Sequence, residues 1–131
     1  MKTARLDVRS GGHTEMKDIT GEIERLVKES GISEGICTLF VPHTTAAVTI
    51  NENADPDVKR DFIMELEKIV PWEDGYRHME GNSAAHLKAS MIGFSEQVFI
   101  EDGRLVLGTW QGIYFCEFDG PRNRKLYVRI D

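Results

Sequence analysis

Short apolar runs and helical stripes alternate along the chain, and together they predict an α+β fold. In the runs, apolar residues either alternate with polar ones or fill the whole segment, which is typical of β-strands. The runs lie at residues 2–9, 35–41, 45–52, 97–100, 104–107, 112–118 and 124–130. The Asp-Gly pair at 102–103 predicts a hairpin turn between two of them.

Three segments repeat apolar residues at helical spacing, and each carries residues that favour a helix start or end. They run from Asp18 to Gly31, from Asp55 and Pro56 to Pro71, and from Asn82 to Gly93. Asp55 suits the N-cap position and Pro56 the first helical position. Asp18 and Asn82 are predicted to cap the other two helices.

The order of these elements indicates how they pack. Hairpin connections dominate, so the sheet or sheets should be largely antiparallel, with about three helices packed on one face. Several strands, notably 112–118, are apolar on both faces, so a second sheet or a neighbouring subunit should cover the other face. The prediction is one domain over residues 1–131 that assembles into an oligomer.

Composition narrows the classes of function. The 131 residues carry a net charge of −6, with a pI near 5.2, which argues against binding to nucleic acid or to anionic membranes. No apolar stretch approaches the ~20 residues of a membrane span, and the first residues lack the apolar segment of a signal peptide. Two cysteines without a CxxC pattern indicate a reduced, cytoplasmic protein.

Three histidines stand at element boundaries, where binding residues are usually displayed. His43 follows the strand 35–41, His78 lies in the loop 72–81, and His86 is in the first turns of the third helix. Three imidazoles from three elements can form a zinc site with an open fourth position. The spacing shows no HxH or HExxH pattern, so ordinary hydrogen-bonded histidines are the alternative.

Acidic residues near the strand 45–52 offer a catalytic carboxylate or a partner for a metal-binding histidine. Glu52 continues the core-facing positions of that strand, where a carboxylate tends to have a perturbed pKa; the alternative is a strand end that turns to water. Asp55 and Asp57 fit the helix start, where acids complement the helix dipole. Glu80 and Thr44 are further candidates for orienting a histidine.

Two loops near the C-terminus hold candidate ligand-binding groups. Trp110 and Gln111 lie between two glycines in GTWQG, where an indole and an amide can contact a planar ring; a β-bulge with Trp110 in the core is the alternative. Arg122, in the loop DGPRN, suits bidentate phosphate binding, whereas Arg124 and Lys125 are expected on a solvated face. His13 is interpreted as a solvated loop residue, and Cys37 and Cys116 as buried, inert thiols.

Three long segments resemble the YjbQ family in order and spacing. They are VPHTTAAVTINENADPDVKRDF, YRHMEGNSAAHLKASMIG and DGRLVLGTWQGIYFCEFDGPRNRKLYV, and agreement before Cys37 is looser. The resemblance implies an α+β subunit that assembles as a trimer, with clefts near the subunit contacts. It also implies a secondary thiamine-phosphate synthase activity, in which a pyrimidine diphosphate joins a thiazole phosphate and pyrophosphate is released.

The family motifs imply roles for individual residues as well. A divalent metal such as zinc, which suits imidazoles better than magnesium does, would be bound by His43, His78 and His86. The implied catalytic residues are Glu52, Asp55 and Arg122, and the implied substrate-binding residues are Thr44, Thr45, Asn51, Asn82, Trp110 and Gln111. The expected partner is a small phosphorylated heteroaromatic ligand. Two alternatives stay open: a non-catalytic trimeric protein that binds a metal or small ligand, and a metal-dependent hydrolase.

Overall fold

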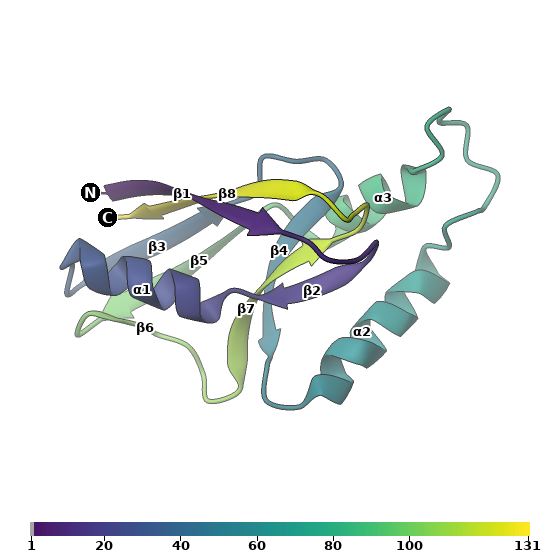
Figure 1. The fold of residues 1–131 in the computed structure, drawn as a ribbon. Helices are drawn as coiled ribbons and strands as arrows, with labels where there is room; N and C mark the ends of the chain where they lie inside the picture. The colour runs from purple at the N-terminus through teal and green to yellow at the C-terminus, as the bar shows by residue number, and fades with distance from the viewer. Residues whose placement is uncertain (1) are drawn as a thin grey trace.

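Two antiparallel sheets and three helices make up the chain in the computed structural model, which describes residues 2–131 (Figure 1). The elements are β1 (Lys2–Arg9), β2 (Glu15–Asp18), α1 (Thr20–Ser30), β3 (Gly35–Phe40), β4 (Ala46–Glu52), α2 (Pro56–Ile69), α3 (Ser83–Ile92), β5 (Ser95–Glu101), β6 (Arg104–Leu105), β7 (Gln111–Glu117) and β8 (Asn123–Ile130). The predicted α+β class with antiparallel pairing is confirmed.

The strands divide into a large and a small sheet. The large sheet has the order β1-β8-β3-β5-β6, and the small sheet has the order β2-β7-β4. Every pairing is antiparallel. Strand β2 was missed by the sequence pattern because it has four residues, of which Met16 alone is buried; its pairing with β7 decides its conformation.

The main core lies between the two sheets and is closed by α1. It combines inward residues of both sheets, such as Leu39, Val48 and Phe115, with Ile23 and Val27 of α1. Alternate residues of a strand point to opposite faces, so the neighbours of these small-sheet residues point outward.

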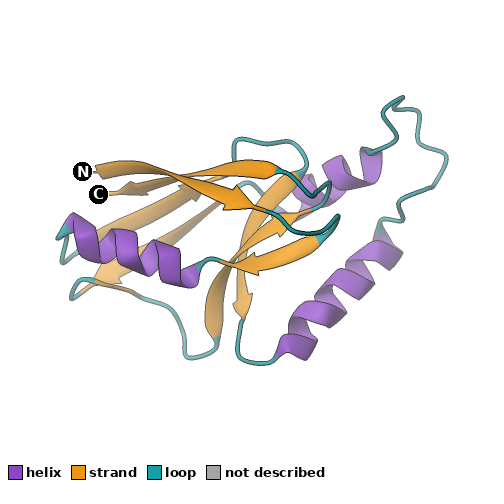
Figure 2. Ribbon diagram, viewed as in Figure 1, coloured by secondary structure: helices purple, strands orange, loops and turns teal. Residues whose placement is uncertain are grey.

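A second core lies on the outer face of the small sheet. Ala47, Tyr114 and Cys116 face this side, and they pack against Leu66 of α2 and Ala85 of α3. Figure 2 shows α2 and α3 together on one side of the strands, with α1 apart from them. The expectation that all three helices share one face is therefore wrong: burial on both faces explains why residues 112–117 are buried without a break.

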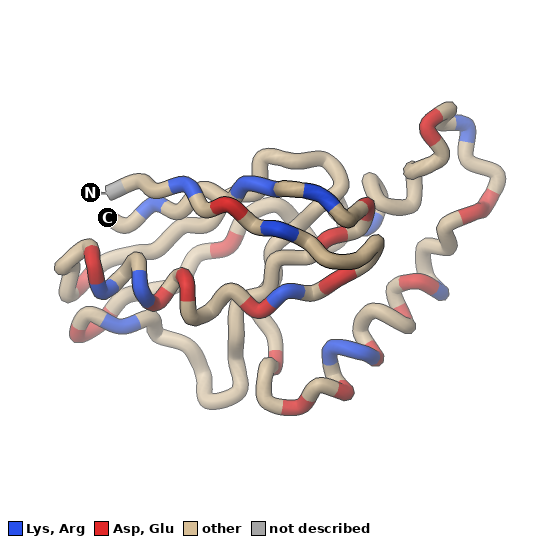
Figure 3. Tube along the Cα trace, viewed as in Figure 1, with Lys and Arg blue, Asp and Glu red and all other residues tan. Residues whose placement is uncertain are grey.

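The outer face of the large sheet is uncovered in the single chain. Ile36, Phe40, Phe99 and Tyr127 lie on it, and Phe99 is 65% exposed. Polar residues share this face, including the Thr38–Gln97 pair at its centre. Figure 3 shows the acidic and basic positions interspersed over strands and helices instead of gathered in blocks.

The predicted helix start is confirmed in full at α2 and in position at α3, and it is wrong by one residue at α1. The Asp55 carboxylate accepts a hydrogen bond from the Asp57 N–H at 2.9 Å, and Pro56 begins α2. The N-cap of α1 is Ile19 instead of Asp18, whose carboxylate accepts from the Thr20 N–H. Asn82 is the N-cap residue of α3, but its side chain makes no capping bond. None of the helices in residues 2–131 has the length and apolarity to span a bilayer.

Candidate functional site

A cleft of about 430 Å³ brings together all three histidines singled out from the sequence. We call it the histidine cleft. Its lining residues come from the β3–β4 loop, the loop before α3, the first turns of α3 and the β7–β8 hairpin. They are Pro42, His43, Thr44, Thr45, His78, Glu80, Asn82, His86, Arg122 and Arg124.

His43 is tied to the backbone of β8. Its Nε2 accepts a hydrogen bond from the Lys125 N–H at 2.9 Å. Burial and the nearby charge of Arg124 hold the pKa of His43 below its ordinary value. The ring is therefore neutral near pH 7, and the proton of a neutral imidazole with an accepting Nε2 resides on Nδ1.

Arg124 is buried, which corrects the prediction that it lies on a solvated face. Its side chain is 3% exposed and forms an ion pair with Glu117. Its Nη2 also donates to the Thr45 Oγ1 at 2.8 Å. Arg124, Leu126 and Val128 are alternate residues of β8, and all three are buried. Because alternate residues of a strand share a face, this spacing could have revealed the burial of Arg124.

Glu117 anchors the hairpin that carries both arginines. Burial by itself raises the pKa of Glu117, but hydrogen bonds from Arg124, the Asp119 N–H and Ser10 outweigh it and lower the pKa overall. Ser10 Oγ donates to Glu117 at 2.7 Å and accepts from the Arg122 N–H at 2.9 Å. One buried carboxylate thereby sets the positions of Arg124 and of the Arg122 backbone.

Arg122 and Asn82 meet at Asp119. The half-exposed Arg122 donates through Nε to the Asp119 carbonyl at 2.8 Å and through Nη2 to its carboxylate at 3.1 Å. Asn82 Nδ2 donates to the same carboxylate at 2.9 Å, while its buried Oδ1 has no hydrogen-bond partner in the described chain. If the Asn82 amide were flipped, its oxygen would face the Asp119 carboxylate oxygen, and the two would repel. The buried atom without a hydrogen-bond partner is therefore the amide oxygen, Oδ1.

His78 and His86 face each other in the cleft. Their ring centroids are 5.5 Å apart with the planes nearly perpendicular. Within residues 2–131, no three His, Cys, Asp or Glu side chains come together in a way that could hold a metal ion. His43 cannot join the pair through Nε2 while that atom accepts from Lys125. The three histidines do not fit a zinc centre in this arrangement. The divalent metal implied by the family resemblance is not tested by this arrangement alone and stays a prediction.

Comparison with known proteins places the chain in a family. The family model described as "UPF0047 protein YjbQ-like" matches residues 4–131. The chain belongs to the YjbQ family. A YjbQ-family relative, the UPF0047 protein YugU of Bacillus subtilis, is 54% identical over 126 residues, covering 95% of this chain and 96% of the relative. A UPF0047 protein of Methanocaldococcus jannaschii is 48% identical, covering 96% of this chain and 91% of the relative.

Solved YjbQ-family structures share the fold. An uncharacterized conserved protein of Clostridium acetobutylicum is 52% identical with a TM-score of 0.96, covering 98% of this chain and 99% of that chain. A protein of unknown function from Sulfolobus solfataricus is 34% identical with a TM-score of 0.94, covering 98% and 95%. The family match runs back to residue 4 and so includes β1 and α1, where the motifs were looser.

Other residues of the YjbQ motifs lie far from the cleft. We call their location the far end of the small sheet. Glu52 pairs with Gln111 there, whereas Ala46 pairs with Glu117 beside the cleft. The six steps from Ala46 to Glu52 span about 20 Å at the rise of an extended strand. Within one chain, the site residues of the far end cannot contact a ligand held by the histidines. They are Asn51, Glu52, Asp55, Trp110 and Gln111.

The side chains at the far end make mainly local contacts. Gln111 Oε1 accepts from the Gly108 N–H at 2.8 Å, and Asn51 Oδ1 accepts from the Glu52 N–H at 2.7 Å. Trp110 is 62% exposed, so the interpretation that places it in the core is wrong. A Cβ on Gly112 would overlap the side chain of Asn53. The space that this glycine leaves is therefore occupied by Asn53 of the same chain.

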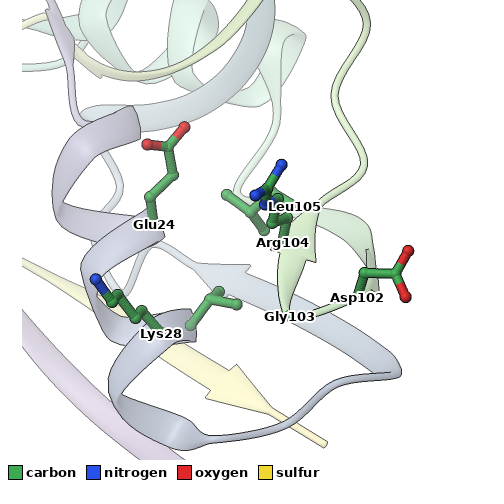
Figure 4. A pocket seen from close by; sticks show the side chains of 7 residues that line it. Glu24, Lys28, Asp102, Gly103, Arg104 and Leu105 are labelled. Atoms are coloured by element: carbon green, nitrogen blue, oxygen red, sulfur yellow. The ribbon is translucent and has the colours of Figure 1, made fainter.

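A larger hollow of about 520 Å³ lies between α1 and the β5–β6 hairpin. We call it the charged groove. Lys28 and Arg104 line it together with Glu24 and Asp102, and Figure 4 shows the Asp102 carboxylate directed away from Glu24 and Lys28. The groove has mixed charge and is lined by no histidine, cysteine or hydroxyl group, so we assign the chemistry to the histidine cleft.

The remaining sequence candidates have structural roles. Cys37 and Cys116 are free and buried, and burial raises their pKa values to about 11 and about 12. Both are therefore inert thiols, as predicted. His13 is half-exposed, as expected of a loop residue, but its ring also packs edge-on against Trp72 with centroids 4.5 Å apart.

Proposed function

We propose that this chain is a thiamine-phosphate synthase-like transferase that binds its diphosphate substrate in the histidine cleft. The observation that carries the proposal is the convergence of Arg122, Arg124 and His43 on one cleft. Oriented N–H donors are the groups that bind phosphate oxygens most strongly. Thr44, Thr45 and Asn82 line the same cleft and offer further polar contacts.

The proposed step forms one bond and breaks another. The nitrogen lone pair of the thiazole phosphate attacks the methylene carbon that carries the diphosphate of the pyrimidine. The C–O bond breaks as the C–N bond forms, and its electron pair leaves with pyrophosphate. No proton moves in this step, so a general base is not required. The cleft would contribute by stabilising negative charge on the departing oxygens.

The far-end residues enter this proposal through a second copy of the chain. We propose a homotrimer in which neighbouring subunits cover the outer face of the large sheet. That face continues through Phe40 and Phe94 to the loop bearing His43, so an interface there would border the cleft. Glu52, Asp55 and Trp110 could then contribute from another subunit. Light scattering of the purified protein would give the mass, and three times 14.8 kDa is expected.

Pyrophosphate release tests the proposed function. The purified protein is incubated with the pyrimidine diphosphate and the thiazole phosphate, and pyrophosphate and the coupled product are measured. Arg122→Ala is expected to lower kcat/KM by about 100-fold, the usual cost of removing one donor to a developing oxyanion. Arg104→Ala in the charged groove is the matched control and should leave the rate unchanged. The wild-type protein releasing no pyrophosphate would refute the proposal, and release without thiazole would indicate a hydrolase.

A non-catalytic ligand-binding protein is the second candidate. The specific observation in its favour is that both guanidinium groups are already paired with carboxylates, Arg124 with Glu117 and Arg122 with Asp119. Such a cleft offers directed N–H donors without a large net positive charge. Mass spectrometry of the protein as purified would support this candidate if it found a stoichiometric bound phosphorylated metabolite and the assay found no turnover.

A further inference from the structure

We propose that His43 and Arg124 form an oxyanion-binding pair, in which His43 is a neutral Nδ1–H donor instead of a metal ligand. This inference rests on the proposed binding of a phosphorylated ligand in the histidine cleft. It assigns the atoms that bind the ligand oxygens, one of them on Arg124, which the sequence pattern had placed on a solvated face.

The position of Lys125 explains why His43 Nε2 is occupied. Strand β3 pairs with β8 only as far as Phe40 opposite Tyr127. Lys125 lies two residues beyond that point, where no strand carbonyl from β3 remains for its N–H. His43 Nε2 takes the place of that carbonyl at 2.9 Å. This bond satisfies a backbone donor at the end of the sheet and ties the His43 ring to β8.

The accepting role of Nε2 decides the chemistry of the other nitrogen. A backbone N–H can only donate, so Nε2 must present its lone pair to Lys125. A neutral imidazole then carries its proton on Nδ1, which has no lone pair for a metal. Metal binding at Nε2 would break the bond to Lys125, whereas donation from Nδ1 to a ligand oxygen leaves it intact.

Arg124 supplies the second donor. Its Nε and Nη2 are fixed by Glu117 and Thr45. Its Nη1 makes no hydrogen bond with the described residues, although Arg124 lines the cleft. Thr45 also lies two residues from His43, so both members of the pair are held by the same short segment. The guanidinium is therefore positioned before a ligand arrives, with the two N–H groups of Nη1 still available.

The orphan Oδ1 of Asn82 adds a requirement on the ligand. Asn82 is 9% exposed and lines the same cleft. Its buried Oδ1 lacks a donor among the described residues, and such an acceptor is stabilised by an incoming N–H or O–H group. We infer a ligand with an anionic phosphoryl group for His43 and Arg124 and a hydrogen-bond donor group for Asn82.

Nitrogen NMR of the histidine side chains tests the tautomer directly. In protein labelled with ¹⁵N-histidine and kept in EDTA, the His43 Nε2 signal should be that of an unprotonated nitrogen and Nδ1 that of a protonated one. Pyrophosphate should shift Nδ1 and leave Nε2 unchanged. A protonated Nε2 in the free protein would overturn the inference, as would zinc that, added after removal of the EDTA, binds stoichiometrically and shifts Nε2 together with His78 and His86.

Two variants separate the two nitrogens of His43. His43→Gln retains an acceptor near Nε2 and loses the Nδ1 donor, while His43→Asn retains an amide donor near Nδ1 and loses the acceptor. By calorimetry in EDTA, His43→Gln should bind pyrophosphate about 10-fold more weakly, the loss of one hydrogen bond to a charged group. His43→Asn should bind within about threefold of wild type but lower the Tm, because the Lys125 N–H loses its partner.

The charged groove supplies the control variant. Arg104→Gln in the charged groove should bind pyrophosphate as the wild type does. Equal affinity of wild type and His43→Gln would overturn the pair, even if transferase activity were found. Pyrophosphate binding with the expected variant pattern and no transferase activity would keep the pair and refute the proposed transferase.

Discussion

The two ends of the small sheet carry similar polar residues in opposite physical states. At the cleft end, Glu117 is 1% exposed and pairs with Arg124 of β8, which is 3% exposed and also donates to Thr45. At the far end, the Glu52 backbone accepts from the Tyr114 hydroxyl and donates to Asn51, while its carboxylate makes no hydrogen bond with the described residues. Trp110 stands 62% exposed. Both ends belong to the same family motifs.

The contrast shows which end of the sheet a single chain holds in one geometry. Buried polar groups must be paired, and the pairing holds them in one geometry before a ligand binds. Exposed groups with local bonds have no such constraint. The cleft end therefore has the fixed geometry that the proposed binding site requires within one chain, whereas the far end has it only if the proposed second copy of the chain contacts it.

Loss of the Glu117 carboxylate should have the largest effect. Glu117→Ala leaves the buried Arg124 guanidinium without its partner, and breaking such a pair costs about 3–5 kcal/mol of unfolding free energy. Urea denaturation would measure the change. Asp7→Ala is the matched control, because the Asp7–Lys125 pair lies at the surface and surface pairs contribute little. Equal stability of the two variants would show that the cleft end is not a buried network.

Removal of Arg122 should weaken the ligand without unfolding the chain. Its side chain is half-exposed, and Arg122→Ala should reduce pyrophosphate affinity by about 10-fold through lost charged hydrogen bonds. Calorimetry at low and high salt would measure it. Because each arginine is paired with a carboxylate, the affinity of the wild type should change little with salt. A steep salt dependence would contradict the view that the donors act by direction more than by net charge.

Acid should weaken the buried pair at the cleft end. The folded pKa of Glu117 lies below its ordinary value of 4.5, so its contribution to stability is complete above that value and is lost as pH falls through the folded pKa. Chemical denaturation between pH 7 and pH 3 should show stability falling in that lower range. Glu117→Gln should have a flatter profile over the same range, and an unchanged profile would contradict the assignment.

Trp110→Ala should have the smallest effect in a single chain. The far end lies about 20 Å along β4 from the cleft, so pyrophosphate affinity should change less than twofold. Pyrophosphate affinity should be measured at protein concentrations at which the oligomer is intact and at which it is dissociated. A large loss confined to the oligomer would show that a second copy brings Trp110 to the histidine cleft.

Local features of the chain were readable from the sequence, and non-local ones were not. The Asp55–Pro56 start of α2 and the antiparallel hairpins were predicted correctly because caps and turns depend on neighbouring residues. Strand β2 was missed because its conformation depends on pairing with β7, about 100 positions away. Arg124 was misplaced because its burial depends on Glu117 and Thr45, although its register with Leu126 carried a usable signal.

Most helices and strands, the family and the set of polar residues available for chemistry follow from the sequence, because side-chain spacing and motif order are properties of the chain. Which of those residues meet depends on how distant segments pack. The tertiary structure joined His43 to Lys125 across 82 positions and put Glu52 and Trp110 at the opposite end of the same strands. The reason is that a strand carries its two ends about 20 Å apart, while packing between distant segments selects which ends share a cleft.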